Sequence, residues 1–257
     1  MKAHILNSIN ETTRAMGNAA LPYVKVSAEI FAEALWPTRC ASCDRPGATL
    51  CEACEQQLPY IDWNQACPHC GAPFGVQQCC ECNTTMLNAA SREKLPYARA
   101  VSAVSYDEEA KRIVSAFKDK GERRLAYDMA RIMTRCIPPE WLDESPLVTF
   151  VPASTAAFRK RGYDHAQLLS KEVANMAALD HASLYARPRS FDQRQLGRTK
   201  RLANMQKRIQ LLPAASTPPS IIIVDDVCTT GATLFAACDA LENTGVKHIY
   251  CLTFARV

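Results

Sequence analysis

The sequence lacks a long uncharged apolar run, and it carries little net charge. Lys25, Glu29 and Glu33 interrupt the most apolar part of its first 39 residues, which argues against a signal peptide and against a transmembrane helix. The formal net charge is only +4 over 257 residues, so overall charge does not indicate a nucleic-acid or membrane partner. We therefore expect a cytoplasmic protein that does not insert into membranes.

Two common nucleotide-binding motifs are also missing. The sequence contains no Gly-x-x-x-x-Gly-Lys-Ser/Thr, which argues against a P-loop NTPase. It also has no Gly-x-Gly-x-x-Gly after a predicted strand, which argues against a dinucleotide site. Neither class of nucleotide-binding protein is therefore favoured.

Cysteine, by contrast, is abundant, and its distribution is uneven. Nine of the 13 cysteines lie between Cys40 and Cys82. Because cytoplasmic thiols stay reduced, cysteines there serve as metal ligands or as small buried residues rather than in disulfides. We expect the other four, which stand in apolar surroundings, to be core residues: Cys136, Cys228, Cys238 and Cys251.

Four Cys-x-x-Cys pairs follow one another and predict two structural zinc ions. A two-residue gap lets a turn aim both sulfurs at one ion, and two such pairs supply the four thiolates that tetrahedral zinc prefers. The segment has too little apolar material for a core, so each ion would supply folding energy on the order of 10 kcal/mol. A site closed by four thiolates leaves no open position for catalysis. The predicted ligands are Cys40, Cys43, Cys51, Cys54, Cys67, Cys70, Cys79 and Cys82.

The grouping of these cysteines is left open by their spacing. Joining the first pair to the second and the third to the fourth needs only short loops, so we favour it over a cross-braced arrangement. An iron–sulfur cluster is a more distant alternative, because the spacing is typical of structural zinc. Cys80 is an extra thiol inside the last pair. We interpret His69, inside the third pair, as a loop residue rather than a ligand.

From about residue 96 the pattern alternates between short apolar strands and helices. We predict strands at 100–106, 147–151, 221–224 and 248–254, and helices at 107–120, 122–136, 164–179, 200–211 and 231–243. This alternation predicts an α/β fold with a mostly parallel sheet flanked by helices. Three parts follow: a helical extension at 1–38, a cysteine-rich zinc module at 39–85 and the α/β domain at 95–257.

The predicted strand at 221–224 leads into two acids, a loop of small residues and a helix. The acids stand where open α/β sheets bind ligands, and unpaired amides at the start of a helix form a phosphate site. The acids would accept hydrogen bonds from sugar hydroxyls or help to hold a hydrated Mg²⁺. An acidic turn that merely caps a helix is the alternative. We predict that a phosphorylated ribose binds to Asp225, Asp226, Thr229, Thr230, Gly231, Ala232 and Thr233.

Residues 221–234 resemble the phosphoribosyl pyrophosphate (PRPP) motif of type I phosphoribosyltransferases. With the cysteine pairs upstream, residues 36–257 resemble the competence protein F family, which includes GntX-like proteins. Further matches are Phe117-Lys118, Val151-Pro152 and the stretch from Arg161 to Ala166. The resemblance implies a type I phosphoribosyltransferase fold, a double zinc ribbon, PRPP with Mg²⁺ as ligand, and an association with DNA uptake in natural transformation. The family usually has Arg-Gly-Phe-Asn-Gln where this chain has Arg161-Gly162-Tyr163-Asp164-His165.

Two basic segments offer partners for the pyrophosphate of PRPP. Residues 187–208 hold eight lysines and arginines against one acid, and a second run spans 159–161. Arginine binds phosphate oxygens with two donors at once, so we assign Arg161, together with Lys118, to the pyrophosphate side. The charges at 187–208 could instead follow a nucleic-acid strand or form a solvated surface.

Two functions from different classes remain open. One is an enzyme that displaces pyrophosphate from C1 of PRPP–Mg²⁺ with an unidentified acceptor, Asp225 and Asp226 setting the geometry of the ribose and the metal. The other is a non-catalytic factor that binds single-stranded DNA or proteins of the competence machinery through the same fold. No residue is recognisable as a general base from the sequence.

Overall fold

The structure is a computed structural model that describes residues 37–188, 209–213 and 217–257. Most of the predicted helical extension at 1–38, most of the basic segment at 187–208 and most of the predicted helix at 200–211 lie outside the described residues. The chain divides into two compact units, Met1–Gln56 and Gln57–Val257. The boundaries of the three predicted parts stay a prediction.

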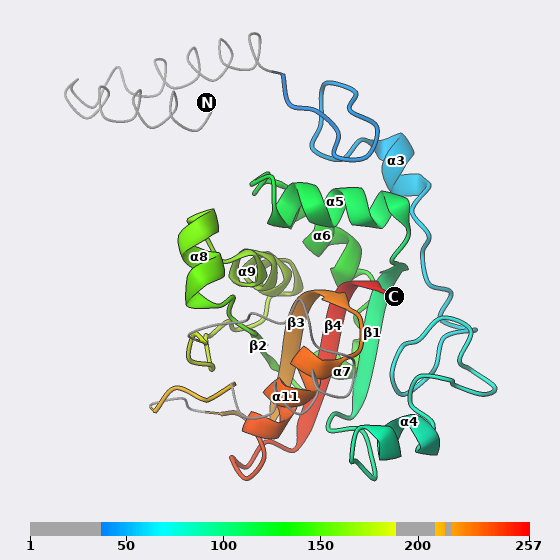
Figure 1. Ribbon diagram of the computed structural model, residues 1–257, viewed down its shortest axis with the longest axis vertical. Coiled ribbons are helices and arrows are strands. Elements are labelled where there is room, and N and C mark those ends of the chain that lie inside the picture. The colour runs from blue at the N-terminus through cyan, green and yellow to red at the C-terminus, as the bar shows by residue number, and fades with distance from the viewer. Residues whose placement is uncertain (1–36, 189–208, 214–216) are drawn as a thin grey trace. The chain divides into compact units, whose positions relative to one another are not determined.

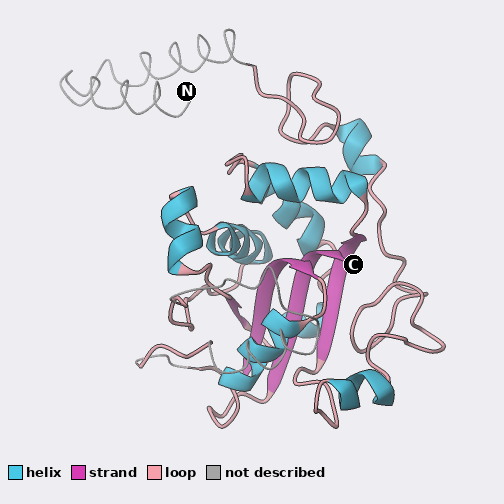
Figure 2. Cartoon of the chain, in the orientation of Figure 1, coloured by secondary structure: helices cyan, strands magenta, loops and turns pink. Residues whose placement is uncertain are grey.

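A four-stranded parallel sheet forms the centre of the second unit (Figures 1 and 2). Its order is β1-β4-β3-β2, and every neighbouring pair is parallel. This confirms the predicted α/β class. β3 continues past Val224 to Cys228, so both acids lie within the strand rather than after it. The strands are β1 (Arg99–Ser105), β2 (Leu147–Phe150), β3 (Ser220–Cys228) and β4 (His248–Arg256).

Capping side chains fix where two of the predicted helices begin. Asp107 accepts a hydrogen bond of 2.8 Å from the Ala110 amide, and Asp164 accepts one of 3.4 Å from the Gln167 amide, as N-cap residues do. The predicted helices have shifted ends: α5 (Glu108–Lys118), α6 (Leu125–Thr134), α9 (His165–Ala177) and α11 (Ala232–Ala240). Shorter helices accompany them: α3 (Glu52–Gln56), α4 (Thr84–Ala89), α7 (Pro139–Leu142) and α8 (Thr155–Arg161). Within the described ranges, no helix combines the length and apolar character that crossing a membrane requires.

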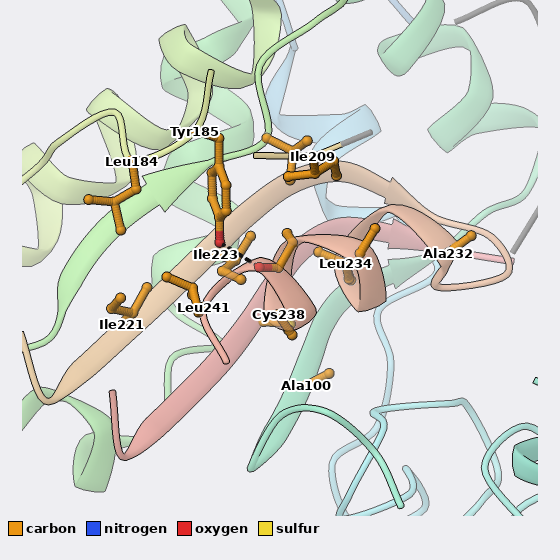
Figure 3. Close-up of a cluster of buried hydrophobic side chains, with 14 of the residues drawn as sticks. Ala100, Leu184, Tyr185, Ile209, Ile221, Ile223, Ala232, Leu234, Cys238 and Leu241 are labelled. Atoms are coloured by element: carbon orange, nitrogen blue, oxygen red, sulfur yellow. Dashed lines mark hydrogen bonds between the residues drawn. The ribbon is translucent and has the colours of Figure 1, made fainter. Parts of the chain in front are cut away.

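Side chains of β3 alternate between two apolar layers, one on each face of the sheet. Ile221 and Ile223 pack in a cluster with residues of α11 (Figure 3). Ile222 is fully buried on the opposite face, where α6 and α9 contact the sheet. In the α11 layer, the Tyr185 hydroxyl donates to the Ala237 carbonyl at 3.1 Å. Because full burial of such a side chain contributes about 1.5–3 kcal/mol, the apolar half of β3 anchors the polar half that follows it.

Candidate functional site

The eight predicted zinc ligands come together as two groups of four. The sulfurs of each group all lie within 4.8 Å of one another, and the closest Sγ–Sγ pairs are 3.5–3.7 Å apart. Zinc–sulfur bonds of about 2.3 Å in a tetrahedron place sulfurs about 3.8 Å apart, so both groups fit zinc. The sequential grouping is confirmed. We call Cys40, Cys43, Cys51 and Cys54 the first tetrad and Cys67, Cys70, Cys79 and Cys82 the second tetrad.

The second tetrad is tied to the sheet by backbone contacts within the second unit. The Ala100 amide of β1 donates to the His69 carbonyl at 2.9 Å, and the Ile61 amide donates to the Ala103 carbonyl at 3.1 Å. Gly71 has a φ of +69°, and a Cβ there would meet the Ala100 carbonyl oxygen at 2.6 Å. Glycine is therefore needed at this turn. His69 serves the turn through its backbone and belongs to neither tetrad.

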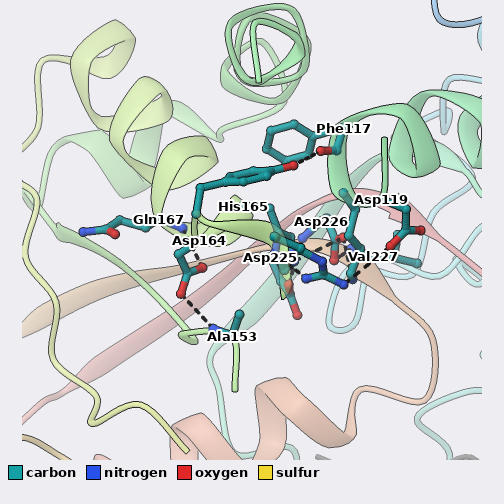
Figure 4. A network of polar contacts seen from close by, with 12 residues as sticks. Phe117, Asp119, Ala153, Asp164, His165, Gln167, Asp225, Asp226 and Val227 are labelled. Atoms are coloured by element: carbon teal, nitrogen blue, oxygen red, sulfur yellow. Dashed lines mark hydrogen bonds and ion pairs between the residues drawn. The ribbon is translucent and has the colours of Figure 1, made fainter. Parts of the chain in front are cut away.

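The two acids of β3 meet the ends of two helices at the carboxyl end of the sheet (Figure 4). Asp226 is buried, and its Oδ2 lies 2.7 Å from the Lys118 ammonium at the end of α5. The same oxygen lies 3.5 Å from Nε2 of His165, the first residue of α9. Asp225 is partly exposed beside it. The fold thus brings Lys118 to the acid pair. That Lys118 or the acid pair binds a ligand stays a prediction.

Burial and neighbouring charges shift the pKa values of the two acids in opposite directions. Burial raises the pKa of Asp225, and the adjacent Asp226 carboxylate raises it further. Burial also raises the pKa of Asp226, but Lys118 and His165 outweigh it and hold that pKa below its ordinary value. Two like charges this close cannot both ionise freely. Asp226 therefore carries the charge of the pair, while Asp225 keeps its proton to a higher pH than an ordinary aspartate.

We expect opposite stability changes when each acid becomes its amide. Asp225→Asn should raise the melting temperature at pH 7, because it removes a carboxyl that ionises above pH ~4 in the unfolded chain but keeps its proton in the fold, a difference that favours the unfolded chain. Asp226→Asn should cost about 1–3 kcal/mol, because the half-buried Lys118 ammonium loses its anion. The stability that ionised Asp226 contributes is fully present above the pKa of an aspartate in the unfolded chain. It is lost as the pH falls through the lower pKa of Asp226 in the folded protein. Thermal unfolding without added metal at pH 4 and pH 7 tests this, and shifts of one sign in both variants would contradict it.

His165 lies at the site, although it was not among the residues predicted from the sequence. Its ring is buried, and Nδ1 lies 3.2 Å from a guanidinium nitrogen of Arg161. Because a guanidinium only donates, Nδ1 accepts and Nε2 carries the proton that faces Asp226. Burial lowers the pKa of His165 to about 4, so the ring is neutral near pH 7. A neutral histidine thus accepts with one atom and donates with another, as the glutamine usual at this family position would. The histidine at a position where the family usually has glutamine was the sequence feature that could have indicated this residue.

Asp164 holds the turn that follows β2. Its buried carboxylate accepts from the Ala153 amide at 2.9 Å and lies 2.8 Å from a guanidinium nitrogen of Arg187. The same nitrogen of Arg187 donates to the Ala153 carbonyl at 2.9 Å. Asp164, the N-cap residue of α9, therefore holds the backbone of this turn in place (Figure 4). An asparagine, usual here in the family, could cap the helix but could not supply the charge that pairs with Arg187.

The predicted phosphate loop lies between β3 and α11, as the sequence indicated. Thr229 is exposed, and Thr230, Gly231 and Thr233 are partly exposed. Gly231 is the N-cap residue with a φ of +72°, so no side chain at that position caps the helix. The Ala232 amide approaches the Thr230 hydroxyl at a weak 3.4 Å. The start of α11 therefore presents backbone amides and threonine hydroxyls, which are the hydrogen-bond donors that bind anions at helix starts.

Comparisons with known proteins match two separate parts of the chain. Residues 158–257 match the family described as phosphoribosyl transferase domain, and residues 31–83 match the one described as double zinc ribbon domain. Competence protein ComFC of Bacillus subtilis is 25% identical over 214 residues, which cover 82% of this chain and 86% of that protein. Competence protein F of Haemophilus influenzae is 23% identical over 217 residues, covering 80% and 90%. The chain therefore combines the two domains of the competence protein F family and is homologous to both of these competence proteins.

Both domain matches contain predicted site residues. The double zinc ribbon match includes both tetrads. The phosphoribosyl transferase match includes every predicted PRPP-binding residue except Lys118, which the fold brings in from α5. Among solved structures, a hypoxanthine phosphoribosyltransferase of Staphylococcus aureus matches with a TM-score of 0.35 and 12% identity. That match covers 52% of this chain and 64%, slightly less than two thirds, of the other.

Proposed function

We propose that this competence protein F family member binds PRPP with Mg²⁺ and transfers its phosphoribosyl group to an acceptor. One observation carries the proposal. The loop from Thr229 to Gly231 is accessible, leads into an α11 without a capping side chain, and follows the two acids on the same strand. Loop amides suit a 5′-phosphate, and carboxyl groups suit ribose hydroxyls. One ligand with both groups, a 5-phosphoribose, satisfies the whole arrangement.

The remaining charges of the site suit the leaving group. In the proposed reaction the bond from C1 to pyrophosphate breaks, the acceptor bonds to C1, and negative charge develops on the departing oxygen. Lys118 and Arg161 are the cations that would stabilise that charge, and both already lie beside the acid pair through Asp226 and His165. His165 stays neutral there, so it holds Arg161 without repelling it.

The Mg²⁺ that accompanies PRPP is compatible with the residues present. Carboxylate oxygens are ligands that Mg²⁺ accepts while it keeps several waters and substrate phosphates. One oxygen each from Asp225 and Asp226 and a ring nitrogen of His165 lie within 4.8 Å of one another. When bound, the ion would neutralise pyrophosphate charge. We assign Asp225 and Asp226 to the ribose hydroxyls and to the waters of that ion.

We place the activity in DNA uptake during natural transformation and in the cytoplasm. The two curated relatives are named as competence proteins, which supports the first assignment. Two four-thiolate sites support the second, because a reducing compartment keeps such thiols available to metal. The acceptor of the phosphoribosyl group remains to be found by experiment.

Binding of PRPP to the full-length, zinc-loaded protein tests the proposal. PRPP with Mg²⁺ at a hundredfold excess over its Kd should stabilise the fold by about 2.7 kcal/mol. Ribose 5-phosphate and pyrophosphate should each shift the melting temperature less, because each fills only part of the site. An absent shift with PRPP would contradict the proposal.

Pyrophosphate release separates the two functions that the sequence left open. Release from PRPP on adding ammonia, nucleobases or single-stranded DNA would support phosphoribosyl transfer. Binding of PRPP without release of pyrophosphate in the presence of any of these acceptors would favour the non-catalytic factor, for which PRPP is a regulatory ligand. Salt-dependent binding of single-stranded DNA that persists in an Asp225→Ala/Asp226→Ala double variant would favour it too.

A further inference from the structure

A buried arginine at the end of β4 joins the second tetrad to the strand that carries the phosphate loop. Arg256 is 6% exposed. One of its guanidinium nitrogens, Nη1, donates to the Cys70 carbonyl at 2.9 Å and to the Cys228 sulfur at 3.3 Å. The other, Nη2, lies 3.8 Å from the Cys70 sulfur. Cys70 is a predicted zinc ligand, and Cys228 is the last residue of β3, directly before the loop.

The phosphate loop follows Cys228 directly in the chain. Cys228 is the last residue of β3, and Gly231, three positions later, is the N-cap residue of α11. The register of the sheet places Cys228 opposite Arg256 on the neighbouring strand. A series of contacts therefore runs from Cys70 through Arg256 to Cys228, the residue that leads into the loop.

The charge of Arg256 makes this series dependent on the metal. A buried cation is costly unless an anion compensates it. Among the described residues Arg256 forms no ion pair with a carboxylate, and its Nε has no hydrogen-bond partner. Four thiolates around one divalent zinc carry a net negative charge, and one of these four sulfurs, that of Cys70, lies 3.8 Å from the Arg256 guanidinium. Zinc bound in the second tetrad would therefore place an anion beside Arg256.

We propose that Arg256 is a positioning residue that couples zinc in the second tetrad to the order of the phosphate loop. Zinc-bound thiolates would hold the guanidinium, and the guanidinium holds the Cys228 sulfur at the point where the loop begins. Loss of this zinc frees Arg256 and loosens the loop. Only the identity of the loop's ligand rests on the proposed function; the coupling between zinc and loop does not.

Hydrogen exchange of the loop tests the coupling without any ligand. In the zinc-loaded full chain, Arg256→Met should retain its fold and speed exchange of the amides at 229–234 by at least about fivefold, the lower end of typical coupling. Arg99→Met is the matched control, because it removes a guanidinium from β1 that pairs with Glu140, and it should leave the loop unchanged. Arg256→Lys, which keeps the charge, should restore part of the protection.

Three further variants keep the coupling falsifiable if Arg256→Met does not fold. Cys228→Ala keeps the tetrad and Arg256 but removes the sulfur that Arg256 contacts, so it should retain both zinc ions and still loosen the loop. Cys82→Ser removes zinc from the second tetrad and should loosen the loop, whereas Cys54→Ser removes it from the first tetrad and should not. Unchanged exchange at 229–234 in folded Arg256→Met, or in Cys228→Ala, would overturn the proposal.

Ligand linkage gives a second measurement. Coupling is reciprocal, so PRPP with Mg²⁺ should slow the release of one zinc ion to a chromogenic chelator by at least about fivefold in the natural sequence, and not in Arg256→Met or Cys228→Ala. An equal slowing in all three proteins would overturn the coupling. If PRPP fails to bind the natural sequence, the proposed function fails, and the hydrogen-exchange comparison alone decides the role of Arg256.

Discussion

Replacing Cys67 with serine should leave one zinc ion per chain instead of two and sharply lower the melting temperature of the second unit. Cys67 is buried and packs with Cys70 and Ala72 in a small cluster that has little apolar area of its own. A structural zinc site supplies about 10–16 kcal/mol of apparent folding energy, which is as large as the stability of a whole domain at about 5–15 kcal/mol. Zinc analysis by mass spectrometry and calorimetry of the full chain measure both effects.

Two other cysteines make this prediction specific. Cys80 neighbours Cys79 but is exposed and belongs to neither tetrad, so Cys80→Ser should keep both ions and the original melting temperature. Cys51→Ser should lose the ion of the first tetrad and leave the unfolding of the second unit in place, because Cys51 lies in the first unit. Two ions retained in Cys67→Ser, or one lost in Cys80→Ser, would show that the tetrads are wrongly assigned.

Affinity for PRPP with Mg²⁺ should fall about 10- to 150-fold in Asp225→Asn and in Asp226→Asn, since a hydrogen bond to a charged group contributes about 1.5–3 kcal/mol. In Asp225→Asn this loss should accompany a higher melting temperature. Such an exchange of stability for binding is expected where a fold keeps, for its function, a carboxyl group that burial and a neighbouring charge disfavour. Isothermal titration calorimetry measures the affinity for PRPP, and thermal unfolding of the same sample measures the melting temperature.

Asp239 supplies the control for this second prediction. It lies at the far end of α11 from the phosphate loop and pairs with Arg92. Asp239→Asn therefore removes a carboxyl from the same helix without touching the site, and PRPP affinity should not change. Equal affinity in the natural sequence and both site variants would show that the acids of β3 do not contact the ligand.

Local spacing accounts for what the sequence predicted well. The members of each tetrad lie within 16 positions of one another, as Cys67 and Cys82 do, so turns alone bring the sulfurs together. The loop from Thr229 to Gly231 is likewise a continuous stretch whose strand and helix follow from adjacent residues. The end of β3 was predicted too early, because Asp225 has low intrinsic strand preference. Pairing with Thr253 of β4 extends the strand through it.

Residues far apart in the chain account for what the sequence could not predict. Lys118 and Asp226, 108 positions apart, form an ion pair only because α5 ends over the carboxyl end of β3. Arg256 and Cys70 are 186 positions apart. Pairing across such distances depends on strand register and helix packing, and no local pattern encodes either.

The sequence by itself predicted two four-cysteine clusters that fit zinc and a loop between a strand and a helix. The tertiary structure decided which charges face each other at the carboxyl end of the sheet, and that Arg256 joins one tetrad to the strand that precedes the loop. The physical reason is that ligand spacing and helix starts are local properties of the backbone. The balance of buried charges is set only when distant segments pack together and exclude water.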